Sequence, residues 1–189
     1  MTSIKSTSVK TTSIKNQQLM IKTAVQTVPR VELPLYCGWW YEQARLDVWF
    51  QRGCTHTTAE YQILPSGGIS VVNRCVDSYG RRKEARADAK ATDSTNSKLK
   101  VRFSVFWPWA GDYWILYLGP VVRGQYSSAV VGSPNRKTLW ILSREPRLSN
   151  KEFAMAVYSA YRQGFDVDKL ILADPTRLSW QRDTHERVG

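Results

Sequence analysis

The sequence lacks several features that would assign a catalytic or membrane-spanning role. It has only two histidines, His56 and His185, and three cysteines in 189 residues. No Gly-x-Ser-x-Gly, Walker or Cys-x-x-Cys motif occurs in it. It also contains no run of 18 apolar residues, so no transmembrane helix is predicted. These absences favour a binding protein over an enzyme, and we expect neither a metal nor a cofactor.

Acidic residues are missing from the first thirty positions, where Thr-Ser-Ile-Lys is nearly repeated three times. We interpret residues 1–31 as a flexible basic tail, which carries five of the charges that give the chain its net +11. The remaining cations are scattered over the predicted strands. Nucleic-acid binding would need a continuous basic face, so no nucleic-acid partner is expected.

The N-terminal part of the sequence matches no targeting signal closely. Residues 19–28 are too polar for the apolar core of a secretory signal, and residues 35–38 resemble a bacterial lipidation site only superficially, because Tyr36 is not small and no apolar stretch precedes it. We therefore expect no secretory signal and no lipid anchor. An organellar transit peptide stays an alternative, because the start of the chain is free of acids and rich in Ser and Thr. The compartment and the oligomeric state stay open.

From residue 33 onward, polar and apolar residues alternate in short segments separated by turns, as in antiparallel strands. The pattern predicts eight strands, near 39–46, 56–64, 68–76, 84–91, 98–106, 113–118, 126–131 and 138–144. A helix is predicted near 149–163, with Ser149 and Glu152 as a capping box and Gly164 at its end. Eight strands can close around one small ligand. We therefore predict an all-β fold, an eight-stranded up-and-down antiparallel barrel over residues 32–175 with one C-terminal helix packed outside, followed by a tail at 176–189.

Eight Trp, nine Tyr and five Phe are a high aromatic content for such a barrel. Alternation assigns one set of residues to the interior. The inward positions are Ala59, Tyr61, Ile63, Ile69, Val71, Asn73, Cys75, Leu99, Val101, Phe103, Tyr113, Ile115, Tyr117 and Trp140. If Trp140 points inward, then Arg144 does as well.

The segment Gly38 to Arg45, Gly-Trp-Trp-Tyr-Glu-Gln-Ala-Arg, resembles the Gly-x-Trp opening of the lipocalin family. Its form is similar to the branch that contains bacterial outer-membrane lipocalins and apolipoprotein D. Further segments follow in the family's order, at 50–54, 59–61, 72–75, 99–103, 113–116, 139–146 and 164–170. The turn at 119–126 departs from the family pattern by being longer.

This resemblance implies a lipocalin/calycin barrel in which Arg144 packs on Trp40 of the motif that begins at Gly38, a contact that we assign to the fold. It also implies that a ligand site is lined by Tyr61, Asn73, Phe103, Tyr113 and Trp140. The alternative is a purely structural role, in which these side chains only fill the core of the barrel. An aromatic and aliphatic wall suits an acyl chain, so a fatty acid or lysophospholipid is the expected ligand, stored or transported and connected with membrane maintenance. The alternative is a lipocalin-fold enzyme acting on a lipid or carotenoid, for which Glu42 is the one candidate acid.

Two smaller points are open. Glu42 is expected to be a structural hydrogen-bond acceptor near the base of the barrel, with a ligand head group or Arg144 as alternative partners. Cys54 and Cys75 flank a predicted hairpin but do not face each other in a regular register, so two buried free thiols are preferred. A bridge between them would need a bulge or bend before residue 56.

The loops expected at the open end of the barrel combine cations with aromatic residues. Arg81, Arg82 and Lys83 lie in one predicted turn, and Trp49 and Phe50 lie in another. Trp107 and Trp109 occupy a third. Such a composition predicts peripheral contact with an anionic membrane.

Overall fold

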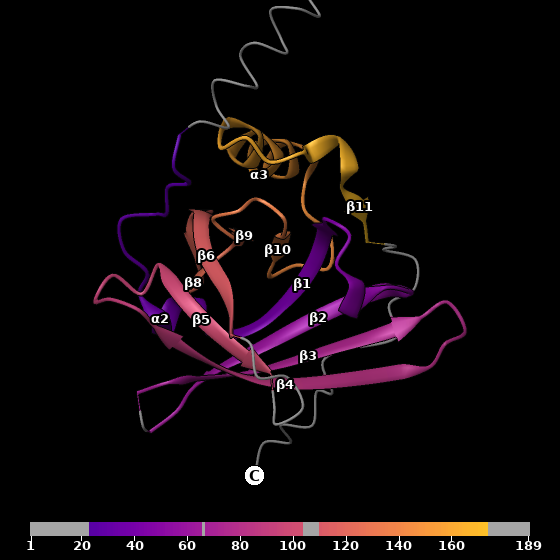
Figure 1. Cartoon of the computed structure of the whole chain (residues 1–189), viewed down its shortest axis with the longest axis horizontal. Coiled ribbons are helices and arrows are strands. Elements are labelled where there is room, and N and C mark those ends of the chain that lie inside the picture. The colour runs from indigo at the N-terminus through magenta and orange to yellow at the C-terminus, as the bar shows by residue number, and fades with distance from the viewer. Residues whose placement is uncertain (1–22, 66, 104–109, 174–189) are drawn as a thin grey trace, which may run out of the picture.

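The computed structural model describes residues 23–65, 67–103 and 110–173. In this part of the chain, eight antiparallel strands form the wall of a barrel (Figure 1). They are β1 (Gly38–Arg45), β2 (Cys54–Ile63), β3 (Ile69–Asp77), β4 (Arg82–Ala91), β5 (Lys98–Phe103), β6 (Ala110–Leu118), β9 (Ser128–Gly132) and β10 (Leu139–Ser143). Each strand pairs with the next, and β10 pairs with β1, so the sheet is closed. The predicted fold class is confirmed.

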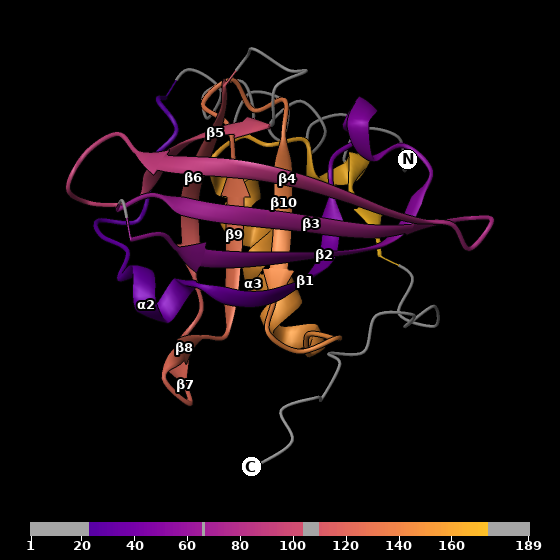
Figure 2. The ribbon, with the colours of Figure 1, turned by 90° about the horizontal axis from the view of Figure 1, so that it is seen from below.

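The two ends of the barrel differ. A short helix, α2 (Leu33–Tyr36), lies at one end, which we call the closed end, and the β3–β4 turn extends from the other, the open end (Figure 2). The β1–β2 loop at the open end contains the 3-10 helix η1 (Trp49–Gln51). The long turn at 119–126 forms a small hairpin, β7 (Val121–Val122) and β8 (Gln125–Tyr126), at the closed end. The sequence pattern does not predict α2.

Helix α3 (Asn150–Arg162) packs on the outside of the barrel against β6 and β9 (Figure 1). Ser149 and Glu152 form the predicted capping box, and Gly164 adopts a positive φ after the last turn. Ala156 and Ala160 of this helix are buried in its contact with the barrel. A second 3-10 helix, η2 (Val167–Lys169), leads to β11 (Ile171–Leu172), which pairs with β1. No helix in the described ranges is both long and apolar enough to span a membrane.

Alternation predicts the interior correctly over most of the wall. Ala59, Tyr61, Val71, Leu99, Val101 and Ile115 all belong to the core cluster inside the barrel. One position differs, because Tyr117 packs in the outer cluster under α3. Ile63 lies opposite the buried Ile69, on the inward face, but is exposed at the end of β2. A register shift between Ile115 and Tyr117 changes the side on which the following residues lie.

The predicted tail is wrong for residues 23–31. Val25 is buried in the cluster with α3, and Val31 is buried in the core inside the barrel. The backbone N–H of Val28 donates to the carbonyl of Ile115, and that of Val31 to Thr95. This segment is held because its few apolar residues fill places that the strands leave open, which composition alone does not show. Residues 1–22 and 176–189 lie outside the described residues.

Candidate functional site

The base of the barrel is built on Trp40 and Arg144, as the sequence predicts. The guanidinium carbon of Arg144 lies 3.7 Å from the centroid of the buried Trp40 ring. Its N–H groups donate to backbone carbonyls of four residues around α2 and one in the β6–β9 connection, namely Leu35, Tyr36, Cys37, Trp39 and Tyr126. Because the Arg144 guanidinium donates hydrogen bonds to all these carbonyls, it fixes α2 over the closed end.

Both backbone conformation and close packing require glycine at position 38. It has φ of 102°, a conformation that side chains disfavour. A Cβ there would lie 2.9 Å from the Gln125 side chain and 3.3 Å from Arg144. The backbone must therefore approach Arg144 closely at this position.

Above Trp40, three tyrosines join their hydroxyls across the interior. The Tyr113 hydroxyl lies 2.7 Å from that of Tyr36 and 2.7 Å from that of Tyr61. Burial raises the pKa of Tyr61 to about 12 and raises the pKa of Tyr113 well above its usual value, so these hydroxyls are neutral. Two of the five predicted ligand residues, Tyr61 and Tyr113, thus meet at the floor of the barrel. The third member, Tyr36, was missed because its helix was not predicted.

Two other predicted residues, Phe103 and Trp140, lie nearer the open end. Phe50 of η1 packs against both, with ring centroids 5.8 Å from Phe103 and 6.4 Å from Trp140. The indole N–H of Trp140 donates to Oε1 of Gln51 at 2.7 Å. The β1–β2 loop therefore reaches into the mouth of the barrel, with Phe50 and Gln51 as its contacts.

Asn73, the fifth predicted residue, lies opposite Ala59 on β2. It is half-buried, as are Phe103, Tyr113 and Trp140, although all four occupy inward-facing positions. The five predicted residues therefore occupy inward positions of one barrel: two at the floor, two near the open end, and Asn73 opposite Ala59.

Glu42 is a buried acceptor, as expected, but its partners come from the open end of the barrel and not from the base. Its carboxylate accepts from Arg45 at 3.4 Å and from Nε2 of Gln51 at 2.9 Å. A bulge between Glu42 and Ala44 lets both Glu42 and Arg45 face inward although they are three residues apart. Burial raises the pKa of Glu42, and Arg45 and Gln51 lower it only in part. The pairing with Arg45 gives this carboxyl a structural role and supplies no acid–base pair.

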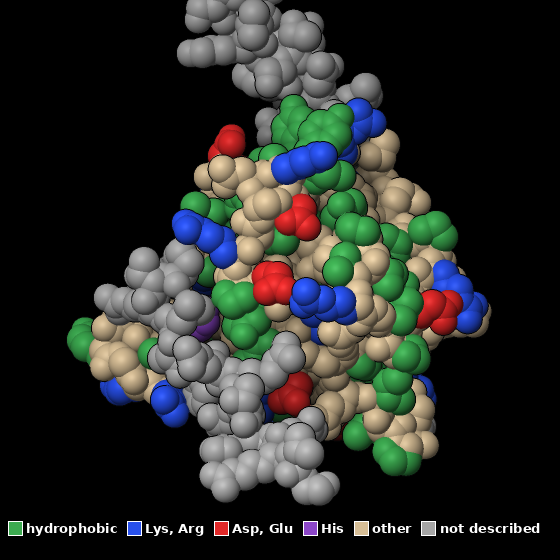
Figure 3. Space-filling model, turned by 180° about the vertical axis from the view of Figure 1, so that it is seen from behind, with side chains coloured by type: hydrophobic (Ala, Val, Ile, Leu, Met, Phe, Trp, Pro, Cys, Tyr) green, Lys and Arg blue, Asp and Glu red, His purple; other side chains and the backbone are tan. Residues whose placement is uncertain are grey.

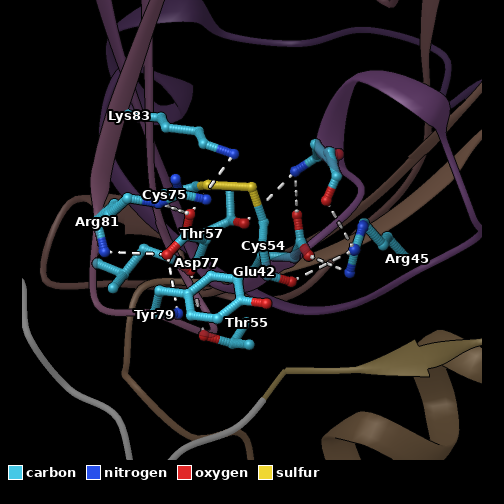
Figure 4. The surroundings of a disulfide bond; sticks show 12 residues. Glu42, Arg45, Cys54, Thr55, Thr57, Cys75, Asp77, Tyr79, Arg81 and Lys83 are labelled. Atoms are coloured by element: carbon cyan, nitrogen blue, oxygen red, sulfur yellow. Dashed lines mark hydrogen bonds and ion pairs between the residues drawn. A yellow bond between two sulfur atoms is a disulfide. The ribbon is translucent and has the colours of Figure 1, made fainter.

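A disulfide joins Cys54 and Cys75 at the open end, so the preferred prediction of two free thiols is wrong (Figure 4). The register of β2 against β3 shifts between Cys54 and His56, which is the bulge that a bridge requires. This extra residue brings the Cα atoms to 5.7 Å. Cys37 is a free cysteine.

The β3–β4 turn beside the disulfide is held by Asp77 (Figure 4). Its carboxylate accepts from the backbone N–H groups of Tyr79 and Arg81 and from the Arg81 side chain at 2.8 Å. Burial alone would raise the pKa of Asp77, but these hydrogen bonds hold it below its usual value. The basic run that begins at Arg81 is thus partly neutralised, since Lys83 also lies 3.8 Å from Asp77.

Aromatic side chains are exposed at the same end. Trp49 is 58% exposed, Phe50 46% and Tyr79 83%. The sequence prediction included the first two and missed Tyr79, which lies under the Arg81 guanidinium. Trp107 and Trp109 lie outside the described residues.

A hollow with a volume of about 360 Å³ lies on the outer face of β2 to β5. Its polar lining includes Glu60, Arg74, Arg86, Asp88 and Arg102. Arg74 is paired with Glu60 and Glu84 and covers the ring of Trp39. Paired charges of both signs do not suit an acyl chain, so this hollow lacks the apolar lining that such a ligand needs.

Charges elsewhere on the surface are also mixed. On the face drawn in Figure 3, the described Lys and Arg side chains alternate with Asp and Glu and form no continuous basic patch. Within the described ranges, no group of three or more His, Cys, Asp or Glu side chains is placed to hold a metal ion.

Comparison with known proteins gives a consistent result. Residues 31–175 match the family model of the lipocalin-like domain. The outer membrane lipoprotein Blc of Vibrio cholerae is 40% identical over 158 residues, which cover 82% of this chain and 90% of that protein. Temperature-induced lipocalin-1 of Arabidopsis thaliana is 35% identical over 157 residues, covering 79% and 82%. Rat apolipoprotein D is 29% identical over 148 residues, covering 74% of each chain.

Among solved structures, insecticyanin of the tobacco hornworm Manduca sexta superposes with a TM-score of 0.60. It is 22% identical and covers 79% of this chain and 84% of its own. At this identity the likeness shows the fold alone.

Proposed function

Because the chain belongs to the lipocalin family, we propose that it binds a single-chain lipid, a fatty acid or lysophospholipid, inside the barrel and exchanges it at an anionic membrane. The proposal concerns storage or transport. The paired state of Glu42 gives the enzyme alternative no support.

The partly exposed inward-facing side chains carry this proposal. Asn73, Phe103, Tyr113 and Trp140 occupy inward positions of their strands and each retains accessible surface. Such surface on the inner side of the wall is available for contact with a ligand. The wall around them is apolar, with Val71, Leu99, Val101 and Ile115 buried between the aromatic rings. Burial of an acyl chain against such a wall contributes about 0.8 kcal/mol per methylene group before entropy costs.

The lipid class is tested by native mass spectrometry of the freshly purified protein, followed by analysis of its extracted lipids. We expect single-chain lipids at one per barrel. Added hexadecanoic acid should also change the Trp fluorescence, because Trp140 lies on the path into the lumen.

A pair of variants assigns that signal. Trp140→Phe should lose most of the fluorescence change, whereas Trp114→Phe should keep it, because Trp114 packs outside the barrel under α3. A full response in Trp140→Phe with unchanged affinity would remove Trp140 from the ligand site.

Membrane exchange rests on the exposed aromatic side chains at the open end. We expect Trp49 to insert shallowly while nearby cations meet anionic head groups, each contributing about 1 kcal/mol close to the surface. Trp49→Ser should slow the transfer of a fluorescent fatty acid between vesicles. Val122→Ser is the matched control, because Val122 is exposed to a similar extent as Trp49, 52% against 58%, but lies at the closed end.

The N-terminal charge is tested separately. Deletion of residues 1–22 removes four lysines and lowers the formal net charge from +11 to +7; it spares the buried Val25 and Val31. We expect weaker adhesion to anionic vesicles at low salt and little change at high salt, where screening is strong. Equal transfer from neutral and anionic vesicles, unchanged by Trp49→Ser, would show that the ligand is taken from solution.

A further inference from the structure

The tyrosine cluster at the floor of the barrel has one more donor than its own bonds can use. Tyr36, Tyr61 and Tyr113 carry three hydroxyl protons, and two hydrogen bonds join their oxygens. Each bond uses one proton. Whichever way the two bonds point, one hydroxyl proton in the cluster has no acceptor within it.

Burial indicates which hydroxyl holds that proton. Tyr36 is 0% exposed and Tyr61 3%, whereas Tyr113 is half-buried and is the middle member of both bonds. If Tyr36 and Tyr61 both donate to Tyr113, each satisfies its own proton, and the Tyr113 proton is the one left for an acceptor outside the cluster. A donor left unsatisfied in an apolar interior is unfavourable, so this arrangement is preferred.

The surroundings decide what kind of acceptor fits. The cluster lies among Trp40, Ile69, Val71 and Leu99, and the nearby Arg144 has its N–H groups on backbone carbonyls below the Trp40 ring. An ionised head group would lose its hydration here without gaining a salt bridge. An uncharged oxygen, a hydroxyl or a carbonyl, loses far less and can accept the proton.

We propose that Tyr113 donates a hydrogen bond to an uncharged oxygen at the far end of the ligand's acyl chain. The ligand then binds with its ionised head at the open end and an oxygen-bearing end at the floor. This inference rests on the proposed lipid-binding function and narrows the ligand class to acyl chains that carry a hydroxyl or ketone at or near their last carbon.

The test compares 16-hydroxyhexadecanoic acid with hexadecanoic acid in displacement of a fluorescent fatty acid. The measured quantity is the ratio of their dissociation constants in the wild type and in Tyr113→Phe. Taking this ratio cancels the cost of bringing a hydroxyl out of water. We expect Tyr113→Phe to shift it against the hydroxy acid by about five- to tenfold, the size of one neutral hydrogen bond.

Two controls isolate the Tyr113 hydroxyl. Tyr36→Phe removes a hydroxyl and a hydrogen bond but leaves Tyr113 free to donate, so its ratio should stay near that of the wild type. Tyr117→Phe changes a tyrosine outside the lumen and should also leave the ratio unchanged. If the ratio of dissociation constants in Tyr113→Phe is within twofold of the ratio in the wild type, the inference is overturned while the lipid-binding proposal stands. Displacement by neither acid overturns both.

A measurement on the wild type keeps the inference testable if Tyr113→Phe fails to fold. The ketone stretching band of carbon-13-labelled 15-oxohexadecanoic acid should move to lower frequency on binding, relative to the same ketone in hexadecane, because it accepts a hydrogen bond. An unshifted band in the bound ligand overturns the inference.

Discussion

At the scale of single residues, Arg144 fixes the closed end by satisfying several carbonyls at once. We expect Arg144→Ala to lower the free energy of unfolding by about 3 kcal/mol, since it leaves buried carbonyls without donors and uncovers Trp40. Urea unfolding measures this loss. Ligand affinity, measured well below the unfolding transition, should change little because Arg144 lies below the floor. A fully stable variant that no longer binds lipid would assign Arg144 to the ligand site instead.

A second residue-scale prediction concerns Glu42. Its pKa is raised in the folded protein, so the folded state holds this proton more tightly than the unfolded state. The resulting stability is present below the unfolded pKa of about 4.5 and is lost as the pH rises through the folded pKa. The free energy of unfolding should therefore fall more steeply with pH above 4.5 in the wild type than in Glu42→Gln. Parallel curves of the free energy of unfolding against pH for the two proteins would contradict a raised pKa of Glu42 in the folded state.

At the scale of an element, the β1–β2 loop places the side chain of Gln51 between two residues of the barrel interior. Gln51 donates to Glu42 and accepts from Trp140. We expect Gln51→Ala to release the loop from the mouth and to raise the rates of ligand entry and exit by about tenfold, the effect of roughly one lost hydrogen bond. Stopped-flow fluorescence measures both rates.

The control for this loop is Arg52→Ala. Arg52 is in the same loop but pairs with Asp47 at the surface, where an ion pair contributes little. Its rates should equal those of the wild type. Acceleration of the same size in both variants would show that general loop disorder, and not the contacts of Gln51, limits ligand entry.

At the scale of the whole molecule, the disulfide links the first residue of β2 to β3 across a hairpin of 22 residues, counting both cysteines. We expect Cys75→Ser to lower the free energy of unfolding by about 3 kcal/mol. Cys37→Ser, which changes the free cysteine, should have a much smaller effect. Under denaturing conditions without reductant, one thiol per chain should react with maleimide. Three reactive thiols before reduction would disprove the bridge.

The sequence by itself determined the barrel and the outer helix, and the resemblance of the motif around Gly38 to the family implied the contact of Trp40 with Arg144. The first two follow from local information: alternation sets the faces of a strand, and the capping box begins α3 at Asn150. These features are local because the side-chain period of a strand or helix is fixed by backbone geometry. The inward positions of the five candidate ligand residues follow from the same period.

The tertiary structure decided whatever depends on a register shift or on a segment that has no pattern of its own. The bulge before His56 made the disulfide, the bulge after Glu42 paired it with Arg45, and the shift after Ile115 turned Tyr117 outward. A bulge adds one residue to one strand and leaves no periodic signal in the sequence. Tyr36 and Gln51 reached the interior from short connecting segments, whose positions are set by the barrel that they close.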